Sequence, residues 1–369
     1  MFSYPDAAKI LKASLQNPVS APLDGASIDT RKIQRGNIFI AIHGEKQDGH
    51  DYLEQAFTQG ASGAIVSAAW LNLHTDILKN PRIKNILPVP DTPQALVDLA
   101  KLYRQTFQVQ VFGITGSIGK TSTKEFLAWL LSKKFSVLST AGNLNNHLGL
   151  PLTLMRLNSE HRVCVAELGA NHVGEIRFLS DILKPDAALV TRVAPVHLEG
   201  FGSLENIYKA KGELLESLKP GSFAVVPDDD PLLARQAERL KLKPVLVGES
   251  FRAHYKVTDV STRGARVHFK INQKYSFSYP GAAAFLARNA AMAIALADSA
   301  AGFKISEMPQ DWQIQMPAGR FEEHQVGPFT FIFDGYNASP DAFEAALKCF
   351  VSLGGSSRKF VAFSDMLEL

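Results

Sequence analysis

The chain has 369 residues, which is enough for two or three domains, and its 46% hydrophobic and 20% charged residues are typical of a globular protein. A formal net charge of only +3 gives no electrostatic reason to expect a nucleic-acid partner. The N-terminus has no charged start followed by an apolar core, and no apolar run approaches the ~20 residues that span a bilayer. We therefore expect a cytoplasmic protein without membrane insertion, whose two cysteines, Cys164 and Cys349, are buried free thiols.

The first 83 residues are predicted to form a small mixed α/β domain. Its predicted elements are a strand at 37–42, a helix at 51–58 and a strand at 63–67. Four prolines between residues 79 and 93 indicate a linker around one short strand, at 85–89. A helix at 94–106 follows, already inside the second predicted domain, and leads toward the glycine-rich segment at 113–123.

Strands and helices alternate from residue 109 to about residue 247, which predicts a doubly wound, mostly parallel sheet. The predicted strands are 109–115, 136–139, 162–168, 187–193, 223–227 and 244–247. The predicted helices include 122–134, 175–183 and 204–218. Residues 253–279 are rich in strand formers, and 282–301 form an alanine-rich helix. In such a sheet, ligands bind beyond the carboxyl ends of the strands.

A third unit begins after Pro317, with a predicted strand at 329–334, a helix at 340–353 and a strand at 359–363. Two strands and one helix cannot bury both faces of a sheet. The sequence therefore predicts an incomplete Rossmann-like domain at the end of the chain. The predicted domain bounds are 1–83, 84–316 and 317–369.

Residues 113–123 carry the most informative pattern, Gly-Ile-Thr-Gly-Ser-Ile-Gly-Lys-Thr-Ser-Thr, between a predicted strand and a predicted helix. Glycines let backbone N–H groups converge on phosphate oxygens, and the positive end of the helix points to the same place. Lys120 would reach the outer phosphates, and the Thr121 hydroxyl would bind Mg²⁺. The loop is a variant, because Ile114 stands where the strict pattern has glycine. The residues expected to bind nucleotide phosphates are Gly116, Ser117, Gly119, Lys120, Thr121 and Ser122.

Further polar groups follow predicted strand ends, where a doubly wound sheet would gather them. Glu167 ends an apolar strand and is placed to bind Mg²⁺, although a strand-end carboxylate can also cap a turn. His197 follows the strand at 187–193, and a lone histidine is more often structural. Lys211 lies on an amphipathic helix, where lysines are usually solvated, and the pattern does not rank it above Lys209.

Two more groups suit nucleotide or sugar recognition. The segment 143–147, Asn-Leu-Asn-Asn-His, is either a plain turn or a site for sugar and phosphate groups. Asn289 could read a base edge, Arg320 could neutralise phosphate, and Asp334 could bind ribose hydroxyls. Taken singly, each of these three is more often structural.

Together these strings resemble the Mur ligase family, the ATP-dependent amino-acid-adding enzymes of peptidoglycan synthesis. The most specific are Glu-Leu-Gly-Ala-Asn-His at 167–172 and His-Leu-Glu-Gly-Phe-Gly at 197–202. The remaining matches, besides the phosphate loop, are Asp-Thr-Arg at 29–31, Gly-His-Asp at 49–51, the segment 143–147, Ala-Lys-Gly-Glu at 210–213, Gly-Arg-Phe-Glu at 319–322, Tyr-Asn-Ala at 336–338 and Asp-Met-Leu-Glu-Leu at 365–369.

The resemblance implies that ATP phosphorylates a substrate carboxylate and that an incoming amine then displaces phosphate. Its implied cofactors are ATP and Mg²⁺, and its implied substrates are a UDP-N-acetylmuramoyl-tripeptide and D-alanyl-D-alanine, bound by a monomer. It assigns Lys120 to the γ-phosphate, Thr121 and Glu167 to one Mg²⁺, and His197 with a carbamylated Lys211 to a second. Carbamylation makes lysine an anionic oxygen donor, which suits Mg²⁺.

The resemblance also distributes the remaining candidates between the two substrates. It places Asn289 at the adenine, Arg320 at the phosphates and Asp334 at the ribose. The residues implied for the UDP substrate are Thr30, Arg31, His50, Asn145, Asn146 and His147.

Other functions compete with this amide ligase. One is another amino-acid-adding ligase of the same family, and another is a phosphate-loop kinase or switch, which would leave 143–147 and the first 80 residues without a role. The third is a catalytically impaired nucleotide-binding fragment, because the predicted third domain is shorter than in most family members.

Overall fold

The structure is a computed structural model that describes residues 3–337, 339–353 and 358–366. Its contacts divide the chain into two units, Met1–Val109 with Asn143–His161, and Gln110–Gly142 with Arg162–Leu369. Within the described ranges, no helix has the length and apolar character needed to cross a membrane. Parts of two quoted strings, Ala338 and residues 367–369, lie outside the described residues.

The first unit is built on a four-stranded parallel sheet in the order β1-β2-β3-β4. Its strands are β1 (Ala26–Ser27), β2 (Ile38–Ile40), β3 (Gly63–Ser67) and β4 (Ile86–Val89). Its helices are α1 (Tyr4–Leu11), α2 (Leu53–Thr58), α3 (Ala68–Leu73), α4 (Thr92–Gln105) and α6 (Gly149–Leu154). A buried apolar cluster that includes Phe39, Val66 and Ile86 holds the strands to the helices.

The first unit extends further along the chain than the predicted domain of residues 1–83. Helix α4 packs against α1 and α6, and the Tyr103 hydroxyl on α4 donates a hydrogen bond to Leu157 O at 2.8 Å. Because these contacts fall inside the first unit, its boundary lies after Val109, and Asn143–His161 returns to it. Strand β4, expected in a linker, is instead an edge strand of this sheet.

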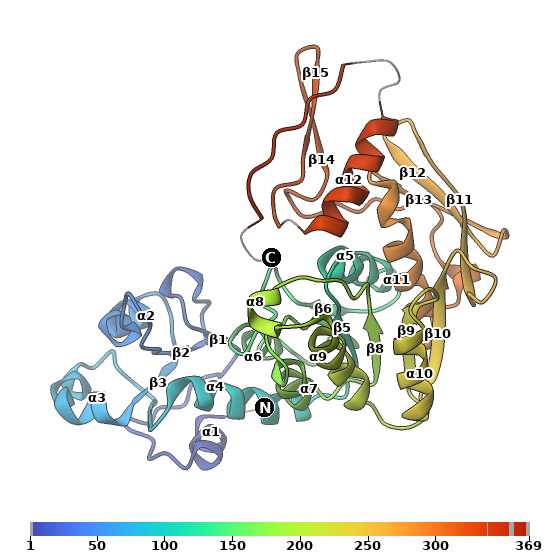
Figure 1. The fold of residues 1–369 in the computed structure, drawn as a ribbon. Helices are drawn as coiled ribbons and strands as arrows, with labels where there is room; N and C mark the ends of the chain where they lie inside the picture. The colour runs from blue at the N-terminus through green and yellow to red at the C-terminus, as the bar shows by residue number, and fades with distance from the viewer. Residues whose placement is uncertain (1–2, 338, 354–357, 367–369) are drawn as a thin grey trace. The chain divides into compact units, whose positions relative to one another are not determined.

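The second unit contains a nine-stranded sheet in the order β13-β12-β11-β10-β9-β8-β5-β7-β6 (Figure 1). Seven strands form its parallel part, and the first six along the chain are β5 (Gln110–Thr115), β6 (Val137–Ser139), β7 (Val163–Glu167), β8 (Ala187–Val190), β9 (Phe223–Pro227) and β10 (Lys243–Gly248). The doubly wound parallel sheet expected from the sequence is therefore confirmed. The strand-rich stretch forms β11 (Tyr255–Arg263), parallel to β10, and an antiparallel meander with β12 (Arg266–Ile271) and β13 (Tyr275–Pro280).

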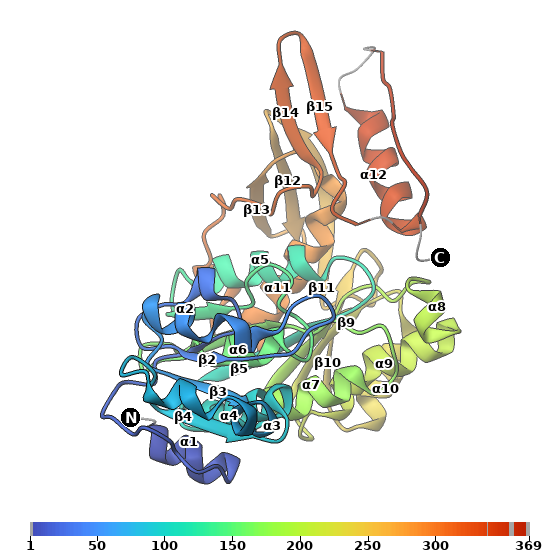
Figure 2. The same ribbon diagram turned by 90° about the vertical axis from the view of Figure 1, so that its left-hand side faces the viewer.

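Helices cover both faces of the parallel strands (Figure 2). Helices α5 (Lys120–Leu131) and α11 (Ala287–Ser299) pack on each other and cover one face, where Phe112 and Ile114 join the main core. Helices α7 (Glu175–Leu183), α9 (Leu204–Glu216) and α10 (Pro231–Arg239) cover the other face, and Gly113 meets Leu214 and Leu183 there. Alternate residues of β5 thus point to opposite layers, as a strand requires.

The last described part forms the two-stranded antiparallel hairpin of β14 (Glu322–Val326) and β15 (Phe329–Phe333), followed by α12 (Pro340–Ser352). Cys349 of α12 reaches the main core, where its thiol lies 3.0 Å from Ala282 O. Cys164 and Cys349 are both buried and free, as predicted. The predicted strand at 359–363 is wrong, because the structure assigns no regular element there and no strand pairs with it among the described residues.

Candidate active site

The candidate active site of the second unit lies at the carboxyl ends of its parallel strands. The phosphate loop, residues 116–119, follows β5, and Glu167 is the last residue of β7. The chain after β8 lies beside the loop, because Ile118 and Arg192 form an isolated bridge. Parallel strands end at one edge of the sheet, so groups distant in sequence gather there.

The phosphate loop is held from the side by the segment that follows β8. The Thr191 hydroxyl donates to Ile118 O at 2.6 Å, and Ser117 N donates to Arg192 O at 2.8 Å. Gly116 and Gly119 have φ values of +144° and +84°, and a Cβ atom at Gly116 would collide with Thr191. Only glycine has room for this curl, which ends where α5 begins at Lys120.

Lys120 lies over this curl, since its Nζ donates to Gly116 O at 2.8 Å and to Ser117 O at 3.0 Å. Burial lowers the pKa of Lys120, and the charge of Arg320 lowers it further, while Glu167 acts in the opposite direction. The ammonium, the guanidinium and the carboxylate are therefore close enough to affect one another. A polyanion placed here would meet two cations and the start of a helix.

Arg320 and Asn289 meet the phosphate loop from two other elements. Arg320, just before β14, donates from Nη2 to Thr121 Oγ1 at 3.2 Å and lies over the Tyr336 ring. Asn289 on α11 donates from Nδ2 to Gly119 O at 3.1 Å. Asp334 is exposed and accepts a hydrogen bond from Phe321 N at 3.0 Å.

Glu167 is held through a buried chain of hydrogen bonds. Its backbone N–H donates to Thr140 Oγ1 at 3.0 Å, and its side chain is buried. Thr140 is held in turn by Lys124, whose Nζ donates to Thr140 O at 2.7 Å and pairs with Glu125 at 2.6 Å. The buried Lys124, one helical turn after Lys120, thus fixes the segment against which Glu167 lies.

Lys211 is distinguished from Lys209 by burial, which the sequence pattern did not reveal. Lys211 is 1% exposed and lies in reach of Ala170 O at 3.3 Å, with the Phe201 ring 5.0 Å from Nζ. Lys209 is exposed. Burial, aided by the charge of Lys120, lowers the pKa of Lys211 to about 7. Its amine is therefore largely neutral just above neutral pH, the form that reacts with electrophiles.

His197 precedes the short helix α8 (Leu198–Phe201) and has a positive φ of 50°. Phe201 of that helix is the ring that Lys211 meets, so His197 and Lys211 belong to adjoining segments. Among the described residues, no cluster of three or more His, Cys, Asp or Glu side chains could hold a metal ion. The predicted metal roles of Thr121, Glu167, His197 and Lys211 remain predictions.

Glu213 explains why the Ala-Lys-Gly-Glu string ends in an acid. Its buried carboxylate accepts from Gly174 N at 2.7 Å and Arg177 N at 3.0 Å, at the start of α7. Replacing Glu213 by Met should leave both N–H groups unsatisfied and cost about 1–3 kcal/mol of unfolding free energy, measured by urea denaturation. Glu216→Gln is the matched control, because the contacts of Glu216 with Arg177 and Gln236 are partly exposed, and it should cost less than about 1 kcal/mol. Equal losses in the two variants would contradict this role.

The candidate residues of the first unit differ in their burial and in the hydrogen bonds that their side chains make within the fold. His50 is buried, its Nδ1 lies 2.5 Å from Asp48 Oδ1, and its Nε2 accepts from Ser67 N at 2.9 Å. Both ring nitrogens thus have partners within the fold, and the predicted contact of His50 with the UDP substrate remains a prediction. Arg31 is exposed and held by Asp29, and Thr30 is buried in the same turn.

The Asn145–His147 cluster forms the turn that starts α6. Asn146 Oδ1 accepts from Gly149 N at 2.8 Å and Leu148 N at 3.2 Å, which satisfies the start of the helix. His147 is exposed. This cluster falls in the first unit with Thr30, Arg31 and His50, so all six residues predicted for the UDP substrate belong to one unit.

The sequence reasoning missed several residues that hold the site in place. They include Thr191, Thr140 and Lys124. Thr191 lies inside the predicted strand at 187–193, whereas β8 ends at Val190, so the sequence did not mark it as a residue that follows a strand. Lys124 resembles an ordinary helix charge, and only its contacts reveal its role.

Family models match most of the chain. The Mur ligase middle domain matches residues 114–297, and the Mur ligase family catalytic domain matches residues 22–104. A UDP-N-acetylmuramoyl-tripeptide–D-alanyl-D-alanine ligase from Bacillus subtilis is 34% identical over 98% of this chain and 78% of the relative. The enzyme of the same name from Haemophilus influenzae is 32% identical over the same shares, 98% and 78%.

Solved structures agree with these sequence matches. A crystal structure of MurF from Acinetobacter baumannii has a TM-score of 0.81 and 29% identity, covering 96% of this chain and 77% of that one. MurF ligase from Thermotoga maritima, solved in complex with ADP, has a TM-score of 0.73 and 27% identity, covering 89% of this chain and 74% of that one. The strings quoted from the sequence, the fold and these matches agree that the chain belongs to the Mur ligase family.

Proposed function

We propose that the chain is an ATP-dependent ligase that joins D-alanyl-D-alanine to a UDP-N-acetylmuramoyl-tripeptide, a precursor of peptidoglycan. The observation that carries the proposal is the phosphate loop with Lys120 and Arg320. It is supported by a relative with this ligase name, whose match covers 98% of the chain. The buried Glu167 and Lys211 at the same sheet edge supply the further groups that acyl transfer needs.

The chemistry proceeds in two balanced steps. The terminal carboxylate of the tripeptide attacks the γ-phosphorus of ATP, which forms an acyl phosphate and releases ADP. The amine of D-alanyl-D-alanine then attacks the acyl carbon, loses a proton and expels phosphate, leaving the amide. Lys120, Arg320 and the N–H groups of the loop stabilise charge on the transferred phosphoryl group.

Thr121 and Glu167 supply a hydroxyl and a carboxylate, the oxygen donors that Mg²⁺ prefers, and bound Mg²⁺ would neutralise phosphate charge. His197 and a carbamylated Lys211 form the proposed second set. The lowered pKa of Lys211 supports carbamylation, since a neutral amine is needed to attack carbon dioxide. Asn289 and Asp334 are assigned to the adenine and the ribose.

The UDP substrate is assigned to the first unit. The candidates for its contacts are Thr30, Arg31, His50, Asn145, Asn146 and His147, and the His50 ring also accepts a hydrogen bond from Ser67 N. A monomeric state and a cytoplasmic location belong to the same proposal, and both rest on the sequence.

A phosphate-release assay on the 369-residue chain tests this function. We expect ATP- and Mg²⁺-dependent phosphate release that requires both the UDP-muramoyl-tripeptide and D-alanyl-D-alanine. Release without the dipeptide would favour a kinase or switch, and release with a single amino acid in its place would favour another ligase of the family. The absence of release with both substrates, beside measurable binding of an ATP analogue, would identify an impaired nucleotide-binding chain.

A further inference from the structure

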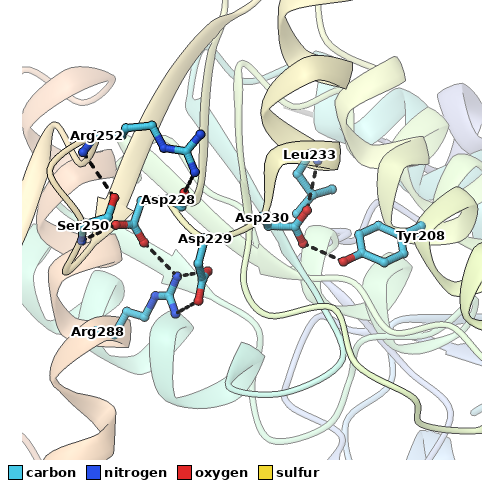
Figure 3. A network of polar contacts seen from close by, with 8 residues as sticks. All are labelled: Tyr208, Asp228, Asp229, Asp230, Leu233, Ser250, Arg252 and Arg288. Carbon is cyan, nitrogen blue, oxygen red and sulfur yellow. Dashed lines mark hydrogen bonds and ion pairs between the residues drawn. The ribbon is translucent and has the colours of Figure 1, made fainter.

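Three consecutive aspartates, Asp228, Asp229 and Asp230, follow β9 at the ligand-binding edge of the sheet (Figure 3). Their side chains contact different helices, and Asp230 also caps the start of α10 through Leu233 N. Asp228 and Asp229 face Arg288 of α11, whereas Asp230 faces Tyr208 of α9. None of these residues has a role in the chemistry proposed above.

Arg288 holds two carboxylates at once. Its Nη1 donates to Asp229 Oδ2 at 3.0 Å and its Nη2 to Asp228 Oδ1 at 3.2 Å, and Nη2 also pairs with Asp229 Oδ1. The planar guanidinium suits this fork, which the single ammonium of a lysine cannot reproduce. Burial works to lower the pKa of Arg288, but the two aspartates outweigh it and raise that pKa.

Asp228 is itself fixed in place. Its side chain is 3% exposed, and its Oδ2 accepts from Ser250 N at 2.7 Å, just after β10. A Cβ atom on Gly248 would collide with the Asp228 carboxylate, so the glycine makes room for it. Through Asp228, Arg288 is therefore held by the segments that follow two sheet strands, β9 and β10.

Arg288 directly precedes Asn289 in the first turn of α11. Asn289 is the residue whose Nδ2 donates to Gly119 O in the phosphate loop. The start of α11 has no side-chain cap. Besides the bond of Asn289 itself, the Arg288 contacts are the side-chain hydrogen bonds that the described residues show in this first turn. A shift of the turn would move Asn289 away from the loop.

We propose that Arg288 is a positioning residue of the nucleotide site, which through Asp228 and Asp229 sets the first turn of α11 so that Asn289 meets the phosphate loop at Gly119. The inference rests on the proposed function, because it takes ATP as the ligand of the loop. Its direct prediction is that Arg288 affects nucleotide binding only through Asn289.

Calorimetry with a non-hydrolysable ATP analogue and Mg²⁺ tests this on the full chain. We expect Arg288→Lys to raise the dissociation constant roughly fivefold to thirtyfold, the upper part of the ~2- to 30-fold range typical of residues that act through a neighbour. Asp229→Asn, at a position that is 59% exposed, should raise it less and leave thermal unfolding nearly unchanged. Arg235→Lys is the matched control on the exposed face of α10 and should have no effect.

Tyr208→Phe provides a second control, because Tyr208 of α9 contacts the third aspartate of the same segment, Asp230. It removes the hydrogen bond to Asp230 at 3.0 Å, which serves α9 and does not touch α11, so nucleotide affinity should stay within about twofold. An equal loss of affinity in Tyr208→Phe and Arg288→Lys would mean that segment 228–230 affects nucleotide binding only through the stability of the fold. That result would overturn the proposal.

A double-mutant cycle then separates positioning from a general loss of structure. In an Asn289→Ala background, Arg288→Lys should cause no further loss of affinity, because the group it positions is gone. Additive losses would overturn the proposal, and so would unchanged affinity in Arg288→Lys while the unaltered chain binds the analogue. Failure of the unaltered chain to bind would instead overturn the proposed function, and this inference with it.

Discussion

Lys120→Ala should lower the rate of ATP turnover by roughly 10²–10³-fold while the fold stays intact. The Nζ of Lys120 lies on the carbonyls of Gly116 and Ser117, in the curl where phosphate oxygens would meet backbone N–H groups. A fixed cation at the point where charge develops is typically worth this factor. Folding should change little, because the two bonds that are lost join the side chain only to its own loop.

The measurement is phosphate release under saturating substrates, paired with thermal unfolding of the same samples. Lys133→Ala is the control, since Lys133 is exposed just beyond the other end of α5, where it lies 4.3 Å from the Trp129 ring. We expect its turnover to match that of the unaltered chain. Near-normal turnover in Lys120→Ala would remove Lys120 from the mechanism, and a large drop in melting temperature would mean that the lost activity reflects unfolding.

Many strands and helices of both units could be predicted from the sequence, because they are short apolar or periodic segments bounded by strong turn signals. The predicted elements at 63–67, 175–183 and 223–227 coincide with β3, α7 and β9. Residues 149–154 were not predicted as a helix, because all six are buried and no helical period separates a polar face. The stretch 359–363 has a strand-like composition, but a strand also requires a partner, which composition does not supply.

The candidate site divides in the same way. The phosphate loop was predictable because its chemistry is local, with glycines, a lysine and a helix start within a few residues. Lys211 was not, because the loop that carries Ala170, 41 residues earlier, and the ring of Phe201 bury it, and a helix pattern does not show such burial. His50 shows a different limit, since the resemblance assigns it to the substrate, but only the structure shows its ring contacts with Asp48 and Ser67.

Arg288 shows why such contacts escape a reading of the sequence. The sequence pattern shows Arg288 only as a charged residue in an alanine-rich helix. Its partners lie 59 and 60 residues earlier, at the end of a strand that becomes a neighbour of α11 only when the sheet forms. Ranking such residues requires the tertiary structure.

Lys211→Ala should abolish ligation, and short carboxylates such as acetate or formate should partly restore it. A small carboxylate can occupy the space of the lost side chain and offer the anionic oxygens that a carbamate would provide. Lys209→Ala is the matched control two residues away, where the side chain is exposed, and its activity should remain nearly normal. A severe Lys209 variant beside a mild Lys211 variant would show that the wrong lysine was chosen.

Uptake of isotope-labelled bicarbonate, read by mass spectrometry after the carbamate is trapped, tests the modification itself. Because burial lowers the pKa of Lys211 to about 7, its amine loses the proton as the pH rises through that value. The neutral amine attacks carbon dioxide, so labelling should increase from about pH 6 to about pH 8, whereas an ordinary lysine would stay protonated throughout. Labelling should vanish in Lys211→Ala and persist in Lys209→Ala. Label that persists in Lys211→Ala would place the carbamate elsewhere, and rescue by carboxylates without any label in the unaltered chain would leave Lys211 acting as an amine.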